Sequence, residues 1–110
     1  MTKKSTRVTD SGGNIFADLD VDAPDEMLAK AQLAHAIISI IKHRHMTQAK
    51  AAKVLGTDQA KVSALANGRL GGFSIERLIH FTKALDRDVE IRISKKPHTR
   101  PKARLHVVPA

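Results

Sequence analysis

The sequence contains no cysteine, tryptophan or tyrosine, and its only aromatic residues are three phenylalanines. The lack of cysteine excludes disulfide bonds and thiolate metal sites and is typical of proteins from a reducing cytoplasm. The scarcity of aromatic rings argues against binding of single-stranded RNA or DNA by base stacking. No apolar run approaches the roughly 20 residues that a membrane-spanning helix needs, and residues 1–4 are not followed by a signal-peptide core. These absences predict a soluble, cytoplasmic protein.

Positive charge is distributed unevenly along the 110 residues, a length that allows about one domain with a modest core. Residues 1–46 contain six Lys or Arg and six Asp or Glu. Residues 47–110 contain thirteen against five, so the whole formal charge of +8 lies in this part. Each phosphate contact made by a basic residue releases counterions, so the surplus favours a polyanionic partner.

The stretch QAKAAKVLGTDQAKVSALANG, residues 48–68, has the spacing of two short helices joined by a tight turn. Close crossing of the helices needs a small fifth residue, which is Ala52, and the turn favours a ninth residue that accepts positive φ, which is Gly56. Val62 and Leu65, three residues apart, share the buried face of the second helix. Any helical hairpin could show this spacing, but a glutamine at each helix start and the closing Asn-Gly favour a helix-turn-helix over about residues 47–67.

The outward face of the second helix is polar or small, as a surface that enters a DNA major groove should be. Base contacts are predicted for Gln59, Ala60, Ser63 and Ala64. The Gln59 amide can pair bidentately with adenine, and the two alanines allow close approach to a thymine methyl group. Phosphate contacts are predicted at the ends of the motif and on its flank, by Thr47, Gln48, Lys61, Asn67 and Arg69. The alternative for each polar residue is simple surface solvation.

The expected fold class is mainly α, with four to five helices and a short C-terminal β-strand or hairpin. Apolar residues at helical spacing predict a long helix over residues 24–43, and Thr47, Asp58 and Ser74 are suitable N-caps for three more. Residues 89–93 alternate between apolar and charged, which is typical of a half-buried strand, and residues 104–108 do so more weakly. An isolated hairpin is only marginally stable, so we expect a homodimer that pairs through Val89, Ile91 and Ile93.

Three regions are expected along the chain: a flexible N-terminal arm at 1–13, a helix-turn-helix DNA-binding domain at 14–86, and a C-terminal β element with a basic tail at 87–110. Ile15, Phe16 and Leu19 are too apolar for an idle linker, so they either pack back on the domain or dock on a protein partner. The basic residues of 95–104 either contact the DNA backbone or only keep the tail soluble.

No catalytic, cofactor or metal site is predicted. His43 and His45 form an H-x-H pair without cysteines or a carboxylate cluster nearby, and the end of a helix favours positive charge. The glycines of 68–72 are not followed by Gly-Lys-Ser/Thr, so they are no phosphate-binding loop. A ribonuclease with histidine as acid and base has no support, because no histidine is paired with an obvious partner. We therefore expect a protein that is not an enzyme.

The residues QAKAA at 48–52, Gly56, DQAKVS at 58–63 and Asn67-Gly68 resemble the lambda-repressor-like, or XRE, helix-turn-helix family. In that family the glutamines at the helix starts and the closing Asn-Gly contact DNA. A narrower resemblance covers roughly residues 13–94, through GNIFADL at 13–19, GFS at 72–74 and DRDVEI at 86–91, and is to HigA-like antitoxins of type II toxin–antitoxin pairs.

The narrower resemblance implies a dimeric repressor on the nucleoid that binds a palindromic double-stranded operator of its own operon. It also implies a RelE-like or HigB-like mRNA-cleaving toxin as partner. Stand-alone XRE regulators of the Cro or repressor kind share these motifs and are the alternative.

Overall fold

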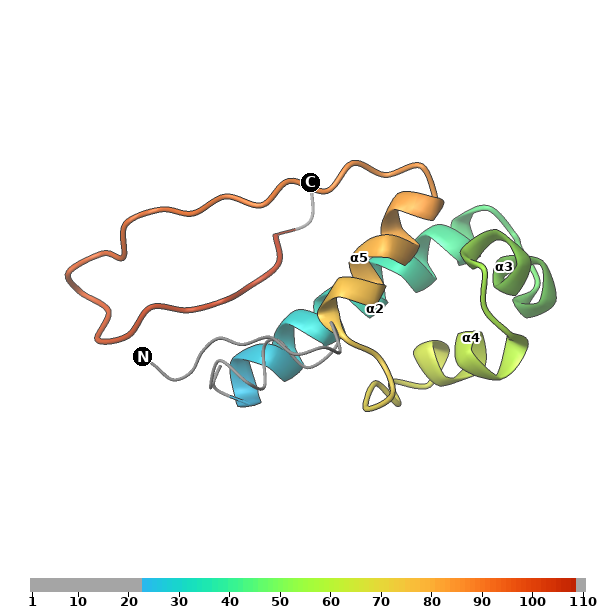
Figure 1. Ribbon diagram of the computed structural model, residues 1–110, viewed down its shortest axis with the longest axis horizontal. Coiled ribbons are helices and arrows are strands. Elements are labelled where there is room, and N and C mark those ends of the chain that lie inside the picture. Colours follow the sequence, from blue (N-terminus) through green and yellow to red (C-terminus); the bar gives the residue numbers. More distant parts are fainter. Residues whose placement is uncertain (1–22, 109–110) are drawn as a thin grey trace.

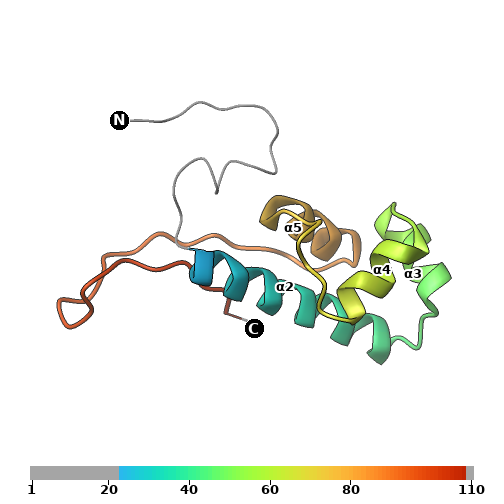
Figure 2. The same cartoon turned by 90° about the horizontal axis from the view of Figure 1, so that it is seen from below.

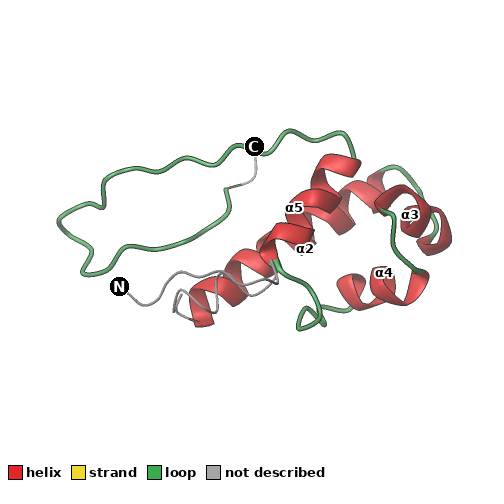
Figure 3. Ribbon diagram, in the orientation of Figure 1, coloured by secondary structure: helices red, strands yellow, loops and turns green. Residues whose placement is uncertain are grey.

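The computed structural model describes residues 23–108, which form four helices and an extended C-terminal tail (Figures 1 and 3). The helices are α2 (Ala23–His43), α3 (Gln48–Leu55), α4 (Gln59–Ala66) and α5 (Ile75–Ala84). All four lie where the apolar spacing and the N-caps predicted them, so the mainly α fold class is confirmed. The predicted N-terminal arm, and Ile15, Phe16 and Leu19, lie outside the described residues.

Helix α2 is the long support on which the other three helices are assembled, all of them on one side of it (Figure 2). Acidic residues in its first turn and basic residues in its last turn suit the helix dipole. Its buried stripe includes Leu33, Ile37 and Ile41, spaced four residues apart. Ile40, three residues after Ile37, is only half-buried at the margin of the core.

The core lies where α5 crosses α2 and where α3 and α4 meet them. Phe73, just before α5, and Phe81 within it pack edge to face with their ring centroids 6.1 Å apart. Leu78 and Leu85 are completely buried beside them. Most side chains in this core are leucine, isoleucine or phenylalanine, and buried alanines such as Ala29 and Ala51 allow the helices to approach closely.

A hydrogen bond that the sequence did not suggest joins the C-terminal ends of α2 and α5. The Arg44 guanidinium donates from Nη2 to the backbone oxygen of Leu85 at 2.7 Å. Leu85 is the C-cap of α5, where carbonyl groups lack partners within the helix. The side chain of Arg44 therefore fixes where α5 ends relative to α2.

The predicted C-terminal strand or hairpin was wrong as a feature of the single chain. Within residues 23–108 no strand is present, and residues 87–108 run outward from α5 and return to α2 as an open, extended loop (Figures 1 and 3). No hydrogen bond in this part of the chain joins the backbone of 89–93 to that of 104–108. The period-two alternation is present, but a strand exists only through a hydrogen-bonded neighbour, and the two extended segments do not pair.

The returning segment of the tail is attached to α2 by side chains. The backbone N–H of Leu105 donates to the Asp25 carboxylate at 3.3 Å, and that of Val107 donates to Oε1 of Gln32 at 2.8 Å. The side chains of Leu105 and Val107 pack against the margin of the core. The tail is thereby held along the N-terminal part of α2.

Candidate nucleic-acid interface

Helices α3 and α4 and the turn between them have the geometry of a helix-turn-helix. Ala52, Val62 and Leu65 are all buried, as close crossing and a shared inner face require. Gly56 ends α3 in the left-handed conformation, with φ of 75°, and its N–H bonds back to the carbonyls of α3. The positions that the spacing selected for the crossing, the turn and the inner face are therefore confirmed structurally.

The outward face of α4 is narrower than the sequence indicated. Gln59 and Ala60 are exposed and Ser63 is half-buried. Ala64, predicted to point outward with them, is instead half-buried and packs against the core cluster. The surface that α4 offers to a partner is therefore centred on its first turn, at Gln59 and Ala60.

The N-termini of α3 and α4 are both capped by side chains. The Thr47 hydroxyl accepts from the Lys50 amide at 3.0 Å, and the Asp58 carboxylate accepts from the Lys61 amide at 2.8 Å. The caps differ in charge, because a neutral hydroxyl begins α3 and a carboxylate begins α4. A phosphate suits the first position much better than the second, since the Asp58 carboxylate would repel it.

The end of α4 is tied by Asn67, whose side chain bonds to Ser63. The Asn67 Nδ2 group donates to the Ser63 carbonyl at 3.0 Å and to its hydroxyl at 3.4 Å. These hydrogen bonds connect Ser63, which is predicted to contact a base, with Asn67, which is predicted to contact a phosphate. Gly68 follows with φ of 74°, and the exposed Arg69 comes next. The turn therefore projects Arg69 from the protein directly after the helix.

Lys61 is held more firmly than a lysine on a helix flank usually is. Its ammonium lies over the Phe73 ring, 5.4 Å from the centroid, and the residue is half-buried. The sequence had placed Lys61 towards the flank without this contact. A cation that is already oriented loses less conformational freedom when it meets an anion.

Charge in the motif is almost entirely positive. Residues 47–74 contain four bases and one acid, and the acid is Asp58, which caps α4. The four bases are Lys50, Lys53, Lys61 and Arg69. Lys50 and Lys53, exposed on α3, were not singled out by sequence reasoning, although their position in the motif was a sufficient signal. This excess favours a polyanion.

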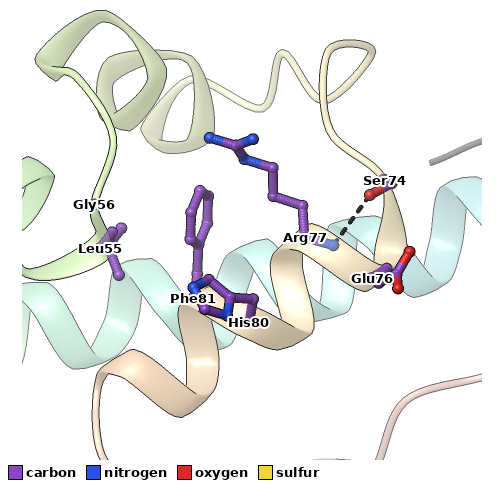
Figure 4. Close-up of a pocket in the computed structure, with 7 residues that line it drawn as sticks. All are labelled: Leu55, Gly56, Ser74, Glu76, Arg77, His80 and Phe81. Atoms are coloured by element: carbon purple, nitrogen blue, oxygen red, sulfur yellow. Dashed lines mark hydrogen bonds between the residues drawn. The ribbon is translucent and has the colours of Figure 1, made fainter. Parts of the chain in front are cut away.

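A shallow hollow of about 510 Å³ lies between the end of α3 and α5 (Figure 4). It is lined by Leu55, Gly56, Ser74, Glu76, Arg77, His80 and Phe81. The Arg77 side chain extends away from α5 over it, with its guanidinium carbon 5.3 Å from the centroid of the Phe81 ring. The hollow is open and is lined by both polar and apolar side chains, so it does not resemble an enclosed ligand site.

Other candidate sites can be checked in the same structure. The described residues hold no group of three or more side chains that could bind a metal ion, and His43 and His45 are both exposed. None of the helices in residues 23–108 is long and apolar enough to cross a membrane.

The residues predicted to pair in a dimer differ in exposure: Val89 is half-buried, whereas Ile91 and Ile93 are exposed. The basic tail swings away from α3 and α4, past the other end of α2 (Figure 1).

Comparison with known proteins agrees with this geometry. A family model for a helix-turn-helix domain matches residues 15–94. A solved structure described as an XRE-family transcriptional regulator is 49% identical to the chain, with 79% of this chain and 98% of that chain covered and a TM-score of 0.75. Among curated proteins, none matches. The chain therefore belongs to the XRE-type helix-turn-helix family of DNA-binding transcriptional regulators.

Proposed function

We propose that this protein is a homodimeric transcriptional repressor that binds a palindromic operator through its domain at residues 14–86. The observation that carries the proposal is the exposed first turn of α4, where Gln59 and Ala60 stand free beside a buried inner face. Each copy places α4 in a major groove, and the half-sites lie about one helical turn apart, roughly 34–36 Å. Such a protein works in the cytoplasm, on the nucleoid.

The division between base and phosphate contacts follows from the charges at the two helix starts. Gln59, behind the Asp58 carboxylate, reads a base edge, and Ala60 and Ser63 line the groove beside it. Thr47 and Gln48, at the uncharged start of α3, receive a phosphate on backbone N–H groups. Lys61, Asn67 and Arg69 contact phosphates on the other side of the groove.

Two substitutions test this division. Gln59→Ala should weaken operator binding by roughly 1–3 kcal/mol in each half-site, because the bidentate pair with a base is removed, and should relax the sequence preference at that position. Lys61→Met keeps the apolar stem over Phe73, and should weaken binding to all sequences alike and flatten the salt dependence by about one unit of slope for each half-site. Binding to randomised operators, measured at several salt concentrations, separates the two effects. Wild-type affinity and specificity in both variants would show that α4 does not enter the groove.

Neutralisation of a RelE-like or HigB-like toxin is the more specific part of the proposal. Its support is the resemblance through residues 13–19 and the exposure of Met27 and Leu28, two large apolar residues in the first turns of α2. Apolar side chains exposed together mark a surface that a partner covers. We propose that Ile15, Phe16 and Leu19, a few residues earlier in the chain, contact the same partner.

Expression of the neighbouring gene, with and without this protein, tests the antitoxin role. Growth arrest by the neighbour that this protein relieves is the expected result. Deletion of residues 1–20 should then abolish relief while leaving operator binding intact, if that segment contacts the toxin. A harmless neighbour, or arrest without relief, would leave a stand-alone regulator of the Cro or repressor kind. Repression of a reporter under the protein's own promoter should persist whether or not the neighbouring gene encodes a toxin.

A further inference from the structure

The outgoing segment of the tail, residues 89–93, is extended, and its backbone forms no ladder with any other segment of residues 23–108. Its backbone N–H and C=O groups bond to no other backbone group in residues 23–108. Ile91 and Ile93 are 76% and 94% exposed, although both are large and apolar. An extended, apolar segment with open edges is a template for pairing with another strand. In this conformation it is a strand without its neighbour.

The rest of the tail is anchored, so the open segment is presented in a defined place. Beyond it the chain turns near residues 97–100, where the Arg100 N–H donates to the Pro97 carbonyl at 3.3 Å and the Lys96 ammonium donates to the Arg100 carbonyl at 2.7 Å. The returning segment is bonded to Asp25 and Gln32 of α2. The segment 89–93 thus follows α5 at one end and leads, through the turn, to a returning segment held on α2 at the other.

The order of charges in this segment is self-complementary. The sequence reads Val89, Glu90, Ile91, Arg92, Ile93, with a single acid and a single base placed symmetrically about Ile91. Glu90 and Arg92 point to the same side, since they form an ion pair of 2.9 Å, and both are strongly exposed. The three apolar residues occupy the other face of the strand.

We infer that residues 89–93 pair with the same residues of a second copy, antiparallel, with Ile91 facing Ile91 on the two-fold axis. Glu90 then lies opposite Arg92 of the second copy at both ends, and Val89 lies opposite Ile93. The interface is isologous, so one pairing satisfies both copies. This inference rests on the proposed homodimer and specifies its register.

Other registers place the wrong groups together. An antiparallel pair centred on residue 90 or 92 puts glutamate opposite glutamate, or arginine opposite arginine. A shift by one residue opposes charged to apolar side chains and turns the apolar set to the wrong face. A parallel pair sets like charges beside each other. The register centred on Ile91 alone matches both charges and the apolar face.

Charge exchange between copies tests the register. Glu90→Arg and Arg92→Glu, each made alone in the full chain, should raise the dimer dissociation constant at least about tenfold at low salt, because each opposes like charges twice. When the two variants are mixed, every cross-strand pair again joins opposite charges. Native mass spectrometry should therefore find heterodimers well above their random share. Neither variant retains the ion pair within one chain, so that pair cannot explain the rescue.

Arg104→Glu is the matched control, since it makes the same charge change in the tail outside the paired segment. Its dissociation constant should stay near that of the wild type, and circular dichroism should show all variants equally helical. A wild-type chain that stays monomeric at 100 times its operator-binding concentration would overturn the homodimer itself and leave 89–93 to the sheet edge of another protein. A wild-type dimer with unaffected charge variants and random mixing would overturn this register alone.

Discussion

Replacement of Gly56 by alanine should destabilise the protein through the backbone alone. Gly56 has φ of 75°, and a Cβ built there meets no atom within 4 Å, so no steric crowding is added. An L-residue in the left-handed region costs about 1–2 kcal/mol. For a domain of this size, a loss of 1 kcal/mol lowers Tm by roughly 4–8 °C. The expected decrease for Gly56→Ala is therefore roughly 4–16 °C.

Gly71 supplies a matched comparison in the same chain. A Cβ at Gly71 also meets no atom within 4 Å, but its φ is not positive. Gly71→Ala should therefore be neutral or stabilising by up to about 1 kcal/mol, because alanine restricts the unfolded chain. Gly56→Asn should fall between the two, since asparagine adopts the left-handed conformation more readily than alanine does.

Chemical and thermal unfolding followed by circular dichroism measures all three variants. If Gly56→Ala unfolded at the wild-type temperature, the left-handed turn between α3 and α4 would not be needed for stability, and the role assigned to position 56 would be refuted. Equal losses in Gly56→Ala and Gly71→Ala would likewise refute it, because the cause would then be something other than φ.

Three further substitutions test the packing around the motif, each measured by unfolding. Ala52→Leu should destabilise by roughly 1–3 kcal/mol, because the buried crossing has no room for a larger side chain; wild-type stability would show a loose crossing. Asp58→Ala should cost about 1 kcal/mol through loss of the bond to the Lys61 amide, and an unchanged midpoint would mean that water replaces the cap. Arg44→Met should cost roughly 1 kcal/mol more than Lys42→Met, because both remove a positive charge at the end of α2 but only the first removes the bond to the Leu85 carbonyl.

Local signals were sufficient for the helices and insufficient for the tail. The caps Thr47, Asp58 and Ser74 act within three residues, so their hydrogen bonds were predictable from the sequence. The strand predicted at 89–93 is absent from the single chain, because its alternation shows which face is apolar and does not show where a hydrogen-bonding neighbour lies. In the single chain none is present within the described residues, and the segment remains an open strand edge.

Interactions between residues distant in sequence were missed for a related reason. The bond from Arg44 to Leu85 spans 41 positions, and no short pattern marks it. The contact of the Lys61 ammonium with the Phe73 ring depends on how the loop 67–73 returns to α5, and the composition of the loop does not specify this path. Ala64 was expected to face outward from helical spacing, but it is partly buried against the core. These placements depend on packing rather than on periodicity.

The length of α4 connects the proposed operator to the proposed dimer. Eight residues at 1.5 Å each give a helix of about 12 Å, which spans only about three or four base pairs at 3.4 Å per step. So short a readout is too frequent in a genome to select one operator among ~10⁶–10⁹ competing sites. Two copies held in a fixed orientation read twice as many base pairs as one copy does. The binding constants of the two half-sites then multiply. A two-fold pairing through residues 89–93 supplies such an orientation, and its symmetry is that of a palindrome. Variants that cannot pair should therefore still bind DNA through its phosphates but lose most of their preference for the operator.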